Sequence, residues 1–138
     1  MNLKNLLLLM LAGIVFIGVV LTAGCTITRI AKDIIPQEAF TLIQNNQNKP
    51  DFAILDVRTP EEFTDGHIEN AINIDFYSET FRDELDNLDK NKTYLIYCHS
   101  GSRSGKALNI MKGLNFKEVY NVSGGIMAWN AEGLPTTK

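Results

Sequence analysis

The stretch that decides the fold runs from residue 93 to residue 103 and reads Thr93-Tyr94-Leu95-Ile96-Tyr97-Cys98-His99-Ser100-Gly101-Ser102-Arg103. Its first five residues form an apolar-rich run typical of a buried strand, and apolar side chains recur at helical spacing over residues 104–114. A cysteine thus ends a strand and is followed by small loop residues, then by an arginine at a helix start. Loop amides and a helix N-terminus both favour negative charge. We therefore predict an anion cradle and a readily ionised, nucleophilic thiol at Cys98, with a buried structural cysteine as the alternative.

The rest of the chain alternates between the same two kinds of element. Strands are predicted at residues 52–57, 71–74, 93–97 and 118–121. Helices are predicted at residues 37–43, after Pro60, at about residues 78–88, at residues 104–114 and around residues 127–130, with a polar loop at residues 44–50. Strands separated by helices imply an α/β fold, with a parallel sheet covered on both faces. Ligands in such sheets bind at the carboxyl ends of strands, where Cys98 falls.

The loop resembles the active-site loop of the rhodanese family, and two other segments extend the resemblance. Residues 56–58 with Glu62, followed by residues 66–68, look like the first family signature. Residues 119–125, with Trp129 and residues 133–135, look like the last one. The matches occur in the right order and cover roughly residues 35 to 135. The resemblance implies a rhodanese-like three-layer α/β/α domain over residues 35–138, with a central parallel sheet.

The length of the loop distinguishes between chemistries. Cys98 and Arg103 are separated by four residues, whereas phosphatases and their rhodanese cousins resemble Cys-x5-Arg. A shorter loop tightens the cradle, which favours a sulfane sulfur over a phosphate ester and disfavours a dual-specificity-type phosphatase or an arsenate reductase. The resemblance implies a thiosulfate sulfurtransferase-like enzyme: Cys98 takes sulfur from a donor such as thiosulfate, becomes a persulfide, and passes the sulfur to a thiol or cyanide. The alternative is a non-catalytic rhodanese-fold binding or sulfur-carrier module at the membrane, although such modules commonly lack the cysteine.

The five residues after Cys98 are the predicted substrate-binding residues. Their amides are expected to stabilise the thiolate, the persulfide and the leaving sulfite. Arg103 has two possible roles: its planar fork suits an oxyanion, or it ties the loop to carbonyls or a carboxylate. Gly101 suits a positive backbone dihedral angle, and Ser100 and Ser102 either donate hydrogen bonds or cap the helix. His99 either assists as a cation or is an ordinary exposed imidazole.

Other conspicuous residues are assigned structural roles. Arg58 is expected to pair with Glu62 or with Asp56, because a buried charge is tolerated mainly when it is paired. His67 resembles a packed, hydrogen-bonded family histidine and is not assigned as a base. Gly124 and Gly125 are expected to let the backbone turn tightly near the active loop. Trp129 is expected to be an aromatic residue of the core or of the pocket wall.

The N-terminus carries a second signal. No charged residue lies between Lys4 and Arg29, and residues 6–21 are almost wholly apolar. Residues 21–25 resemble a bacterial lipobox. This resemblance implies a signal peptide over residues 1–24 and a lipid on Cys25. It also implies a linker over residues 25–34 and a domain on the extracytoplasmic side. The rival is an uncleaved single-pass anchor, because the apolar run exceeds a typical signal core. Both alternatives tether the domain to a membrane.

Composition excludes several other classes. The 138 residues suffice for one domain, and the net charge of −3 without a basic stretch argues against nucleic acid as a partner. The two cysteines and two histidines are too scattered along the chain to form a familiar zinc pattern, so we expect no metal site. We also expect no cofactor. If Cys25 carries a lipid, Cys98 has no intramolecular partner and stays reactive. The sequence does not identify a protein acceptor.

Overall fold

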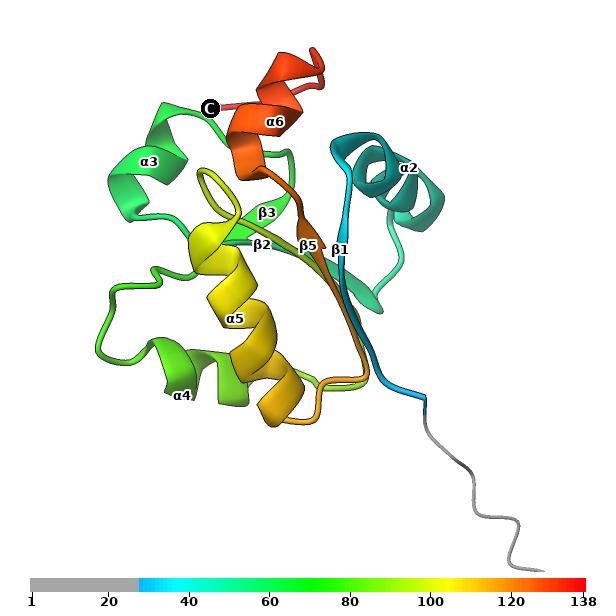
Figure 1. Cartoon of the computed structure of the whole chain (residues 1–138), viewed down its shortest axis with the longest axis vertical. Coiled ribbons are helices and arrows are strands. Elements are labelled where there is room, and N and C mark those ends of the chain that lie inside the picture. The colour runs from blue at the N-terminus through cyan, green and yellow to red at the C-terminus, as the bar shows by residue number, and fades with distance from the viewer. Residues whose placement is uncertain (1–27) are drawn as a thin grey trace, which may run out of the picture.

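The computed structural model describes residues 28–138, which form a parallel sheet between two layers of helices (Figure 1). Strands and helices alternate along most of the chain. In chain order the elements are β1 (Ile30–Ile34), α2 (Pro36–Asn46), β2 (Phe52–Asp56), α3 (Pro60–Asp65), β3 (Ala71–Asn73), α4 (Phe81–Asp86), β4 (Thr93–Tyr97), α5 (Ser102–Gly113), β5 (Glu118–Val122) and α6 (Gly125–Ala131).

The sheet places β4 at its centre. The strand order is β1-β5-β4-β2-β3, and all neighbouring strands are parallel. Leu95 of β4 lies opposite Ile54 of β2 on one side and Tyr120 of β5 on the other. Because the carboxyl ends of parallel strands share one edge of the sheet, Cys98 leaves the middle of that edge directly after β4.

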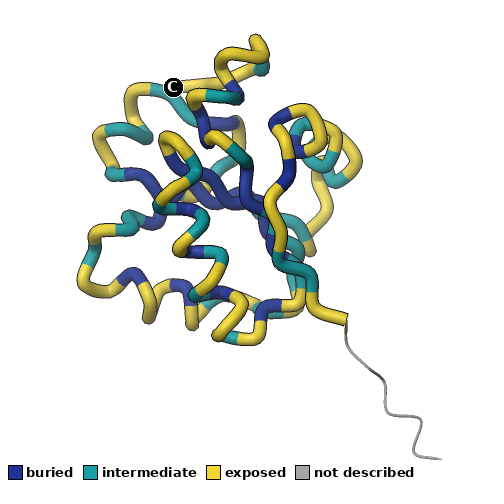
Figure 2. Tube along the Cα trace, viewed as in Figure 1, coloured by how far each residue is buried: buried dark blue, intermediate teal, exposed yellow. Residues whose placement is uncertain are grey.

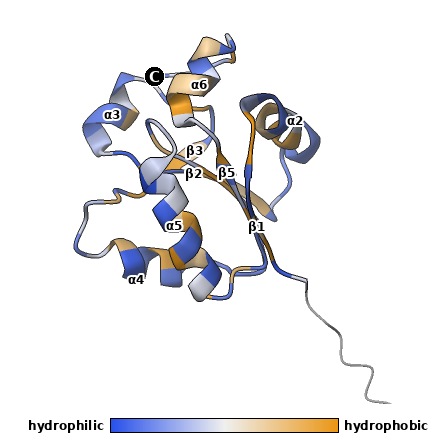
Figure 3. Cartoon of the chain, viewed as in Figure 1, coloured by the Kyte–Doolittle hydropathy of each residue, from blue (hydrophilic) through white to orange (hydrophobic). Residues whose placement is uncertain are grey.

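Side chains of β4 alternate between two cores, one on each face of the sheet. Tyr94 and Ile96 pack in a cluster that includes buried residues of α4 and α5. Leu95 and Tyr97 pack in the opposite cluster with α2 and α6. Figure 2 shows the buried residues following the sheet, and Figure 3 shows hydrophobic residues concentrated on the strands and on the helix sides that face them. Burial on both faces explains why β4 reads as an almost continuous apolar run.

The sheet has one strand more than the sequence predicts. Residues 30–34 fall within the expected linker at residues 25–34, yet they form β1 and pair with β5. Lys32 and Asp33 are exposed, so β1 lacks the apolar run of a central strand. Asp33 accepts a hydrogen bond from Asn121 Nδ2 at 2.7 Å, and Lys32 lies 5.6 Å from the centre of the Tyr120 ring. Pairing with β5 therefore makes this edge strand, and local periodicity does not reveal it.

Several helix boundaries also differ from the predictions. Helix α2 extends to Asn46, through residues that had been expected in a loop, and α4 is shorter than its predicted span. Helix α5 begins at Ser102 instead of residue 104, because Gly101 turns the chain into the helix with a φ of 91°. Arg103 is therefore already part of the first turn of α5. Strand β4 has the predicted bounds.

The predicted leader or anchor and Cys25 lie outside the described residues. Within residues 28–138, no helix combines the length and the apolar character needed to cross a membrane.

Candidate active site

The sulfur of Cys98 lies at the base of the loop between β4 and α5. Its Sγ accepts a hydrogen bond from the Gly101 amide at 3.1 Å and another from Ser104 Oγ at 3.3 Å. Cys98 itself is only 1% exposed. The loop therefore folds back on the sulfur and surrounds it with donors.

These donors favour the thiolate. Burial raises the pKa of the Cys98 thiol, but hydrogen bonds from the Ser104 hydroxyl and from the amides of Ser104, Ser100 and Gly101 more than offset burial, so the net pKa lies below the ordinary value. A thiol with a lowered pKa is a stronger nucleophile near neutral pH, because a larger fraction is ionised.

Ser104 is a site residue that the sequence analysis missed. It is fully buried in the first turn of α5, on the same side as the other buried residues of that helix, Ala107 and Met111. Side chains of a helix point back towards its N-terminus, which here means towards the loop. The signal was available, since a serine stands three residues before Ala107 on an otherwise apolar stripe.

Arg103 is paired with a carboxylate. Its Nη1 and Nη2 donate to Glu62 Oε2 and Oε1, each at 2.7 Å, and its guanidinium carbon lies 5.5 Å from the centre of the Tyr77 ring. Of the two roles considered from the sequence, the structure contains the tie to a carboxylate. The pair joins α5 to α3, two elements that are far apart in sequence.

Glu62 serves two elements at once. It forms a capping box with Thr59: the Glu62 amide donates to Thr59 Oγ1 at 3.3 Å, and Glu62 Oε2 accepts from the Thr59 amide at 3.0 Å. The hydrogen bonds from Arg103 are the main cause that lowers the pKa of Glu62 to about 2. The first turn of α3 therefore presents a permanent carboxylate to Arg103.

Arg58 pairs with Asp56 instead of Glu62. Arg58 Nη2 lies 2.6 Å from Asp56 Oδ2, Nε donates to the same carboxylate, and Nη2 also donates to the Gly66 carbonyl at 2.7 Å. Both side chains are buried. This ion pair connects the end of β2 to the turn that follows α3.

His67 contacts α3 and the C-terminal segment. Its Nδ1 lies 3.0 Å from the Phe63 carbonyl oxygen, and its ring stacks on Phe63 with centroids 3.8 Å apart. Its backbone exchanges hydrogen bonds with Thr137. Among the described residues, the hydrogen bonds to the Cys98 sulfur come from other groups.

The turn before α6 holds the other side of the loop. The Ile126 and Met127 amides donate to the carbonyls of Cys98 and His99 at 2.8 and 3.1 Å. Gly125 has a φ of 60°, and a Cβ on it would lie 2.5 Å from both of those carbonyl oxygens. Only glycine allows the backbones to approach so closely.

Trp129 lies in α6, and Gly124 lies directly before that helix. Trp129 is 1% exposed, and its Nε1 donates to the Pro135 carbonyl at 3.0 Å. Gly124 has a φ of 76° and precedes α6.

The outer loop residues His99, Ser100 and Ser102 are exposed, and their side chains make no hydrogen bond to another described residue.

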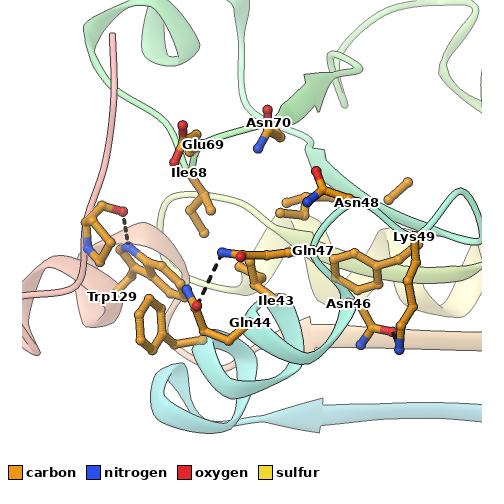
Figure 4. A pocket seen from close by; sticks show the side chains of 15 residues that line it. Ile43, Gln44, Asn46, Gln47, Asn48, Lys49, Ile68, Glu69, Asn70 and Trp129 are labelled. Carbon is orange, nitrogen blue, oxygen red and sulfur yellow. Dashed lines mark hydrogen bonds between the residues drawn. The ribbon is translucent and has the colours of Figure 1, made fainter.

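The described part of the chain includes two cavities of small-molecule size. The larger, of about 430 Å³, lies between the end of α2 and Trp129 and is lined mainly by amide and apolar side chains, with no residue of the loop around Cys98 (Figure 4). The smaller, of about 350 Å³, includes His99 of that loop. Within residues 28–138, no group of three or more acidic, histidine or cysteine side chains is placed to hold a metal ion.

Comparison with known proteins agrees with the architecture. The rhodanese-related protein of Thermoplasma volcanium has a similar structure, with a TM-score of 0.66, 30% identity, and coverage of 77% of this chain and 97% of that one. The rhodanese-like domain protein of Staphylococcus aureus gives a TM-score of 0.61 and 34% identity over 78% of this chain and 99% of that one. These similarities confirm the predicted three-layer α/β/α fold.

Curated relatives carry two kinds of name. A sulfurtransferase of Allochromatium vinosum is 33% identical over 95 residues, covering 69% of this chain and 87% of the relative. A tRNA uridine(34) hydroxylase of Photorhabdus laumondii is 39% identical over 100 residues, which cover 64% of this chain and only 27% of that enzyme. The sequence model of the rhodanese-like domain family matches residues 40–132 of this chain. With its parallel sheet and its cysteine loop after β4, the chain belongs to the rhodanese-like domain family, which includes sulfurtransferases.

Proposed function

We propose that this protein is a sulfurtransferase that carries a sulfane sulfur on Cys98. The observation that carries the proposal is the position of the Cys98 sulfur, which receives hydrogen bonds from the Gly101 amide and the Ser104 hydroxyl at the carboxyl end of the central strand. These donors stabilise a thiolate, and after sulfur transfer the same surroundings suit a persulfide anion.

The reaction has two balanced steps. The Cys98 thiolate attacks the outer sulfur of thiosulfate, the bond between the two thiosulfate sulfurs breaks, and sulfite leaves with the bonding electron pair. A thiophilic acceptor, such as cyanide or a thiolate, then attacks the outer sulfur of the persulfide and releases the Cys98 thiolate. The covalent intermediate predicts ping-pong kinetics.

Arg103 acts in this proposal as a positioning residue. Its guanidinium is occupied by Glu62 in a bidentate pair, so it holds the start of α5 against α3. Stabilisation of the leaving sulfite then falls to the loop amides and to the N-terminus of α5.

The test uses the full-length protein in a mild detergent. Thiosulfate is expected to add one sulfur atom to the Cys98 peptide, and cyanide to remove it as thiocyanate. Cys98→Ser should abolish both steps, whereas the matched variant Cys25→Ser should retain them. Thiocyanate formation at the parent rate by Cys98→Ser would overturn the proposal.

The same measurements separate the alternatives. A non-catalytic module would not take up sulfur from thiosulfate on Cys98, and it would therefore form no thiocyanate from thiosulfate and cyanide. A phosphatase would hydrolyse aryl phosphates through Cys98, and we expect that activity to be negligible beside sulfur transfer. Inserting one residue between Gly101 and Ser102 should impair sulfur transfer, because it widens the loop and moves the Gly101 amide away from the sulfur.

We also propose that the domain is tethered to a membrane through its N-terminus, with a lipid on Cys25 and the domain on the extracytoplasmic side. The support is the uncharged run that ends in a lipobox-like Gly24-Cys25. A single-pass anchor is the alternative.

A further inference from the structure

A cavity of about 350 Å³ opens beside the active-site loop, between α3 and α6. Its walls include His99, the neighbour of Cys98, together with Glu62 and Asp65 of α3 and Asn130 of α6. Figure 1 shows the loop before α5 between these two helices. The volume lies within the range of roughly 300–1,000 Å³ typical of small-molecule sites. A molecule in this cavity would contact His99, the residue that follows Cys98 in the active-site loop.

One wall offers an unused hydrogen-bond donor. Arg58 lines the cavity, is more than nine-tenths buried, and uses Nε and Nη2 on Asp56 and the Gly66 carbonyl. The guanidinium also faces Tyr97, with its central carbon 5.6 Å from the centre of that ring. Burial lowers the pKa of Arg58, but Asp56 and, less strongly, Tyr97 raise it above its ordinary value. The Nη1 of Arg58 nevertheless makes no hydrogen bond of ordinary length to a described residue, and it is not among the fully buried unpartnered atoms. The remaining exposed edge of this guanidinium is therefore free to donate to an oxygen of a ligand, above all to a carboxylate.

Another wall offers a free negative charge. The Asp65 carboxylate is exposed and forms no ion pair or hydrogen bond with another described side chain. Glu62, the other carboxylate of the cavity, is already paired with Arg103. Asp65 is thus the group that would attract a ligand cation, and Asn130 supplies an amide in the same cavity.

We infer that this cavity is an acceptor subsite for an amino-acid thiol, with the ligand carboxylate on Arg58 and the ligand ammonium group on Asp65. A free amino acid such as cysteine carries both charged groups and a thiol on one small molecule. The inference rests on the proposed function of Cys98, because it assigns the acceptor of that same reaction.

The chemical step needs no further reactant. The acceptor thiol loses its proton to solvent, and its thiolate attacks the outer sulfur of the Cys98 persulfide. A new sulfur–sulfur bond forms on the acceptor, the bond to Cys98 breaks, and the Cys98 thiolate leaves with the electron pair.

The test compares acceptors that differ only in their charged groups. Full-length protein is loaded with thiosulfate, and single-turnover discharge is followed with cysteine, cysteamine and 3-mercaptopropionate at equal thiolate concentrations. Cysteine carries both groups, cysteamine only the ammonium and 3-mercaptopropionate only the carboxylate. We expect cysteine to discharge the persulfide faster than either of the other two thiols.

A matched pair of variants tests the role of Asp65. Asp65→Asn should slow discharge by cysteine and by cysteamine about threefold, the effect of losing one exposed charge pair, while discharge by 3-mercaptopropionate and by cyanide does not slow. Asp51→Asn, which changes an exposed aspartate outside the cavity, should leave all four rates unchanged.

The outcomes distinguish the two proposals. The acceptor subsite would be overturned if the three thiols discharged the persulfide at equal rates, or if Asp65→Asn and Asp51→Asn did not differ. With normal loading and normal cyanide discharge, either result would leave the proposed sulfurtransferase activity intact. A failure of Cys98 to load would overturn the proposed function, and the subsite with it.

Discussion

At the scale of single residues, Ser104 acts on the nucleophile together with the loop. Burial of Cys98 by itself would raise its pKa and leave an inert thiol. A hydrogen bond from the Ser104 hydroxyl contributes most to reversing this effect, followed by hydrogen bonds from the amides of Ser104, Ser100 and Gly101. A buried hydroxyl with a sulfur as its hydrogen-bond partner is therefore part of the reactive centre.

Replacing Ser104 tests this balance. Ser104→Ala removes the side-chain donor and keeps the helix, so we expect a higher Cys98 pKa and a several-fold slower reaction with iodoacetamide at pH 7. The pH dependence of alkylation, read from the mass of the Cys98 peptide, should shift to higher pH. Ser102→Ala, an exposed serine two residues earlier on the same helix, is the control and should behave like the parent. Identical alkylation profiles for both variants would assign Ser104 a packing role only.

At the scale of elements, the loop is held between two short helices that reach it from separate parts of the chain. Helix α6 holds it through backbone hydrogen bonds to the Cys98 and His99 carbonyls, and α3 holds the start of α5 through Glu62 and Arg103. Each contact restricts the backbone that supplies donors to the sulfur. Preorganised donors of this kind contribute most to stabilising developing charge.

A pair of glycine substitutions tests the contact with α6. Gly125→Ala would place a Cβ 2.5 Å from the Cys98 and His99 carbonyl oxygens, whereas a Cβ on Gly133 would meet nothing within 4 Å. Both glycines have a positive φ, 60° and 69°, so both alanine variants pay the backbone cost of roughly 1–3 kcal/mol. We expect only Gly125→Ala to lose most of its cyanide-dependent sulfur transfer. Equal losses in the two variants would show that backbone strain alone explains the effect.

The stabilisation that the Glu62–Arg103 ion pair gives to the folded protein should depend on pH. Because Arg103 lowers the pKa of Glu62 to about 2 from an ordinary 4.5, the pair stabilises the folded protein above about pH 4.5. This stabilisation is lost as the pH falls from about 4.5 towards 2. Glu62→Gln keeps a capping-box side chain but removes the charge. Urea unfolding, followed by the fluorescence of the single tryptophan Trp129, should show a stability gap between parent and variant at pH 7 that closes towards pH 2.

The control for that comparison is Glu61→Gln, its exposed neighbour in the same helical turn. Its stability should follow that of the parent at both ends of the pH range. A gap between parent and Glu62→Gln that stays constant down to pH 2 would exclude the charge pair as its cause.

At the scale of the whole molecule, the described domain accounts for residues 28–138, and the proposed membrane tether rests on the sequence before it. The domain has its own two cores, one on each face of the sheet. The two parts of the chain therefore call for separate experiments.

The proposed tether has a direct test. If Cys25 is lipidated, the N-terminal peptide from the membrane fraction should begin at Cys25 and carry the mass of the lipid, and Cys25→Ser should block lipid attachment. Partitioning into detergent does not discriminate, because an uncleaved anchor partitions in the same way. A peptide that contains Met1 and an unmodified Cys25 would contradict the lipoprotein and leave the single-pass anchor.

The sequence by itself determined the central strand, the nucleophile candidate and the parallel α/β architecture. These features are local. The apolar run at residues 93–97 reflects burial on both faces of the sheet, and Cys98, Gly101 and Arg103 lie within six consecutive residues. The order of the strands along the sheet and the edge strand β1 came only from the structure, because β1 exists through its pairing with β5.

Tertiary structure also decided how the charges pair. Arg58 had two candidate partners near it in the sequence, and it binds Asp56, while Glu62 binds Arg103, 41 residues away. Such a choice depends on which side chains the fold brings within hydrogen-bond distance, and periodicity carries no information about that. The acceptor cavity has the same origin, since its walls come from α3, the loop after β4 and α6, which meet only in the folded domain.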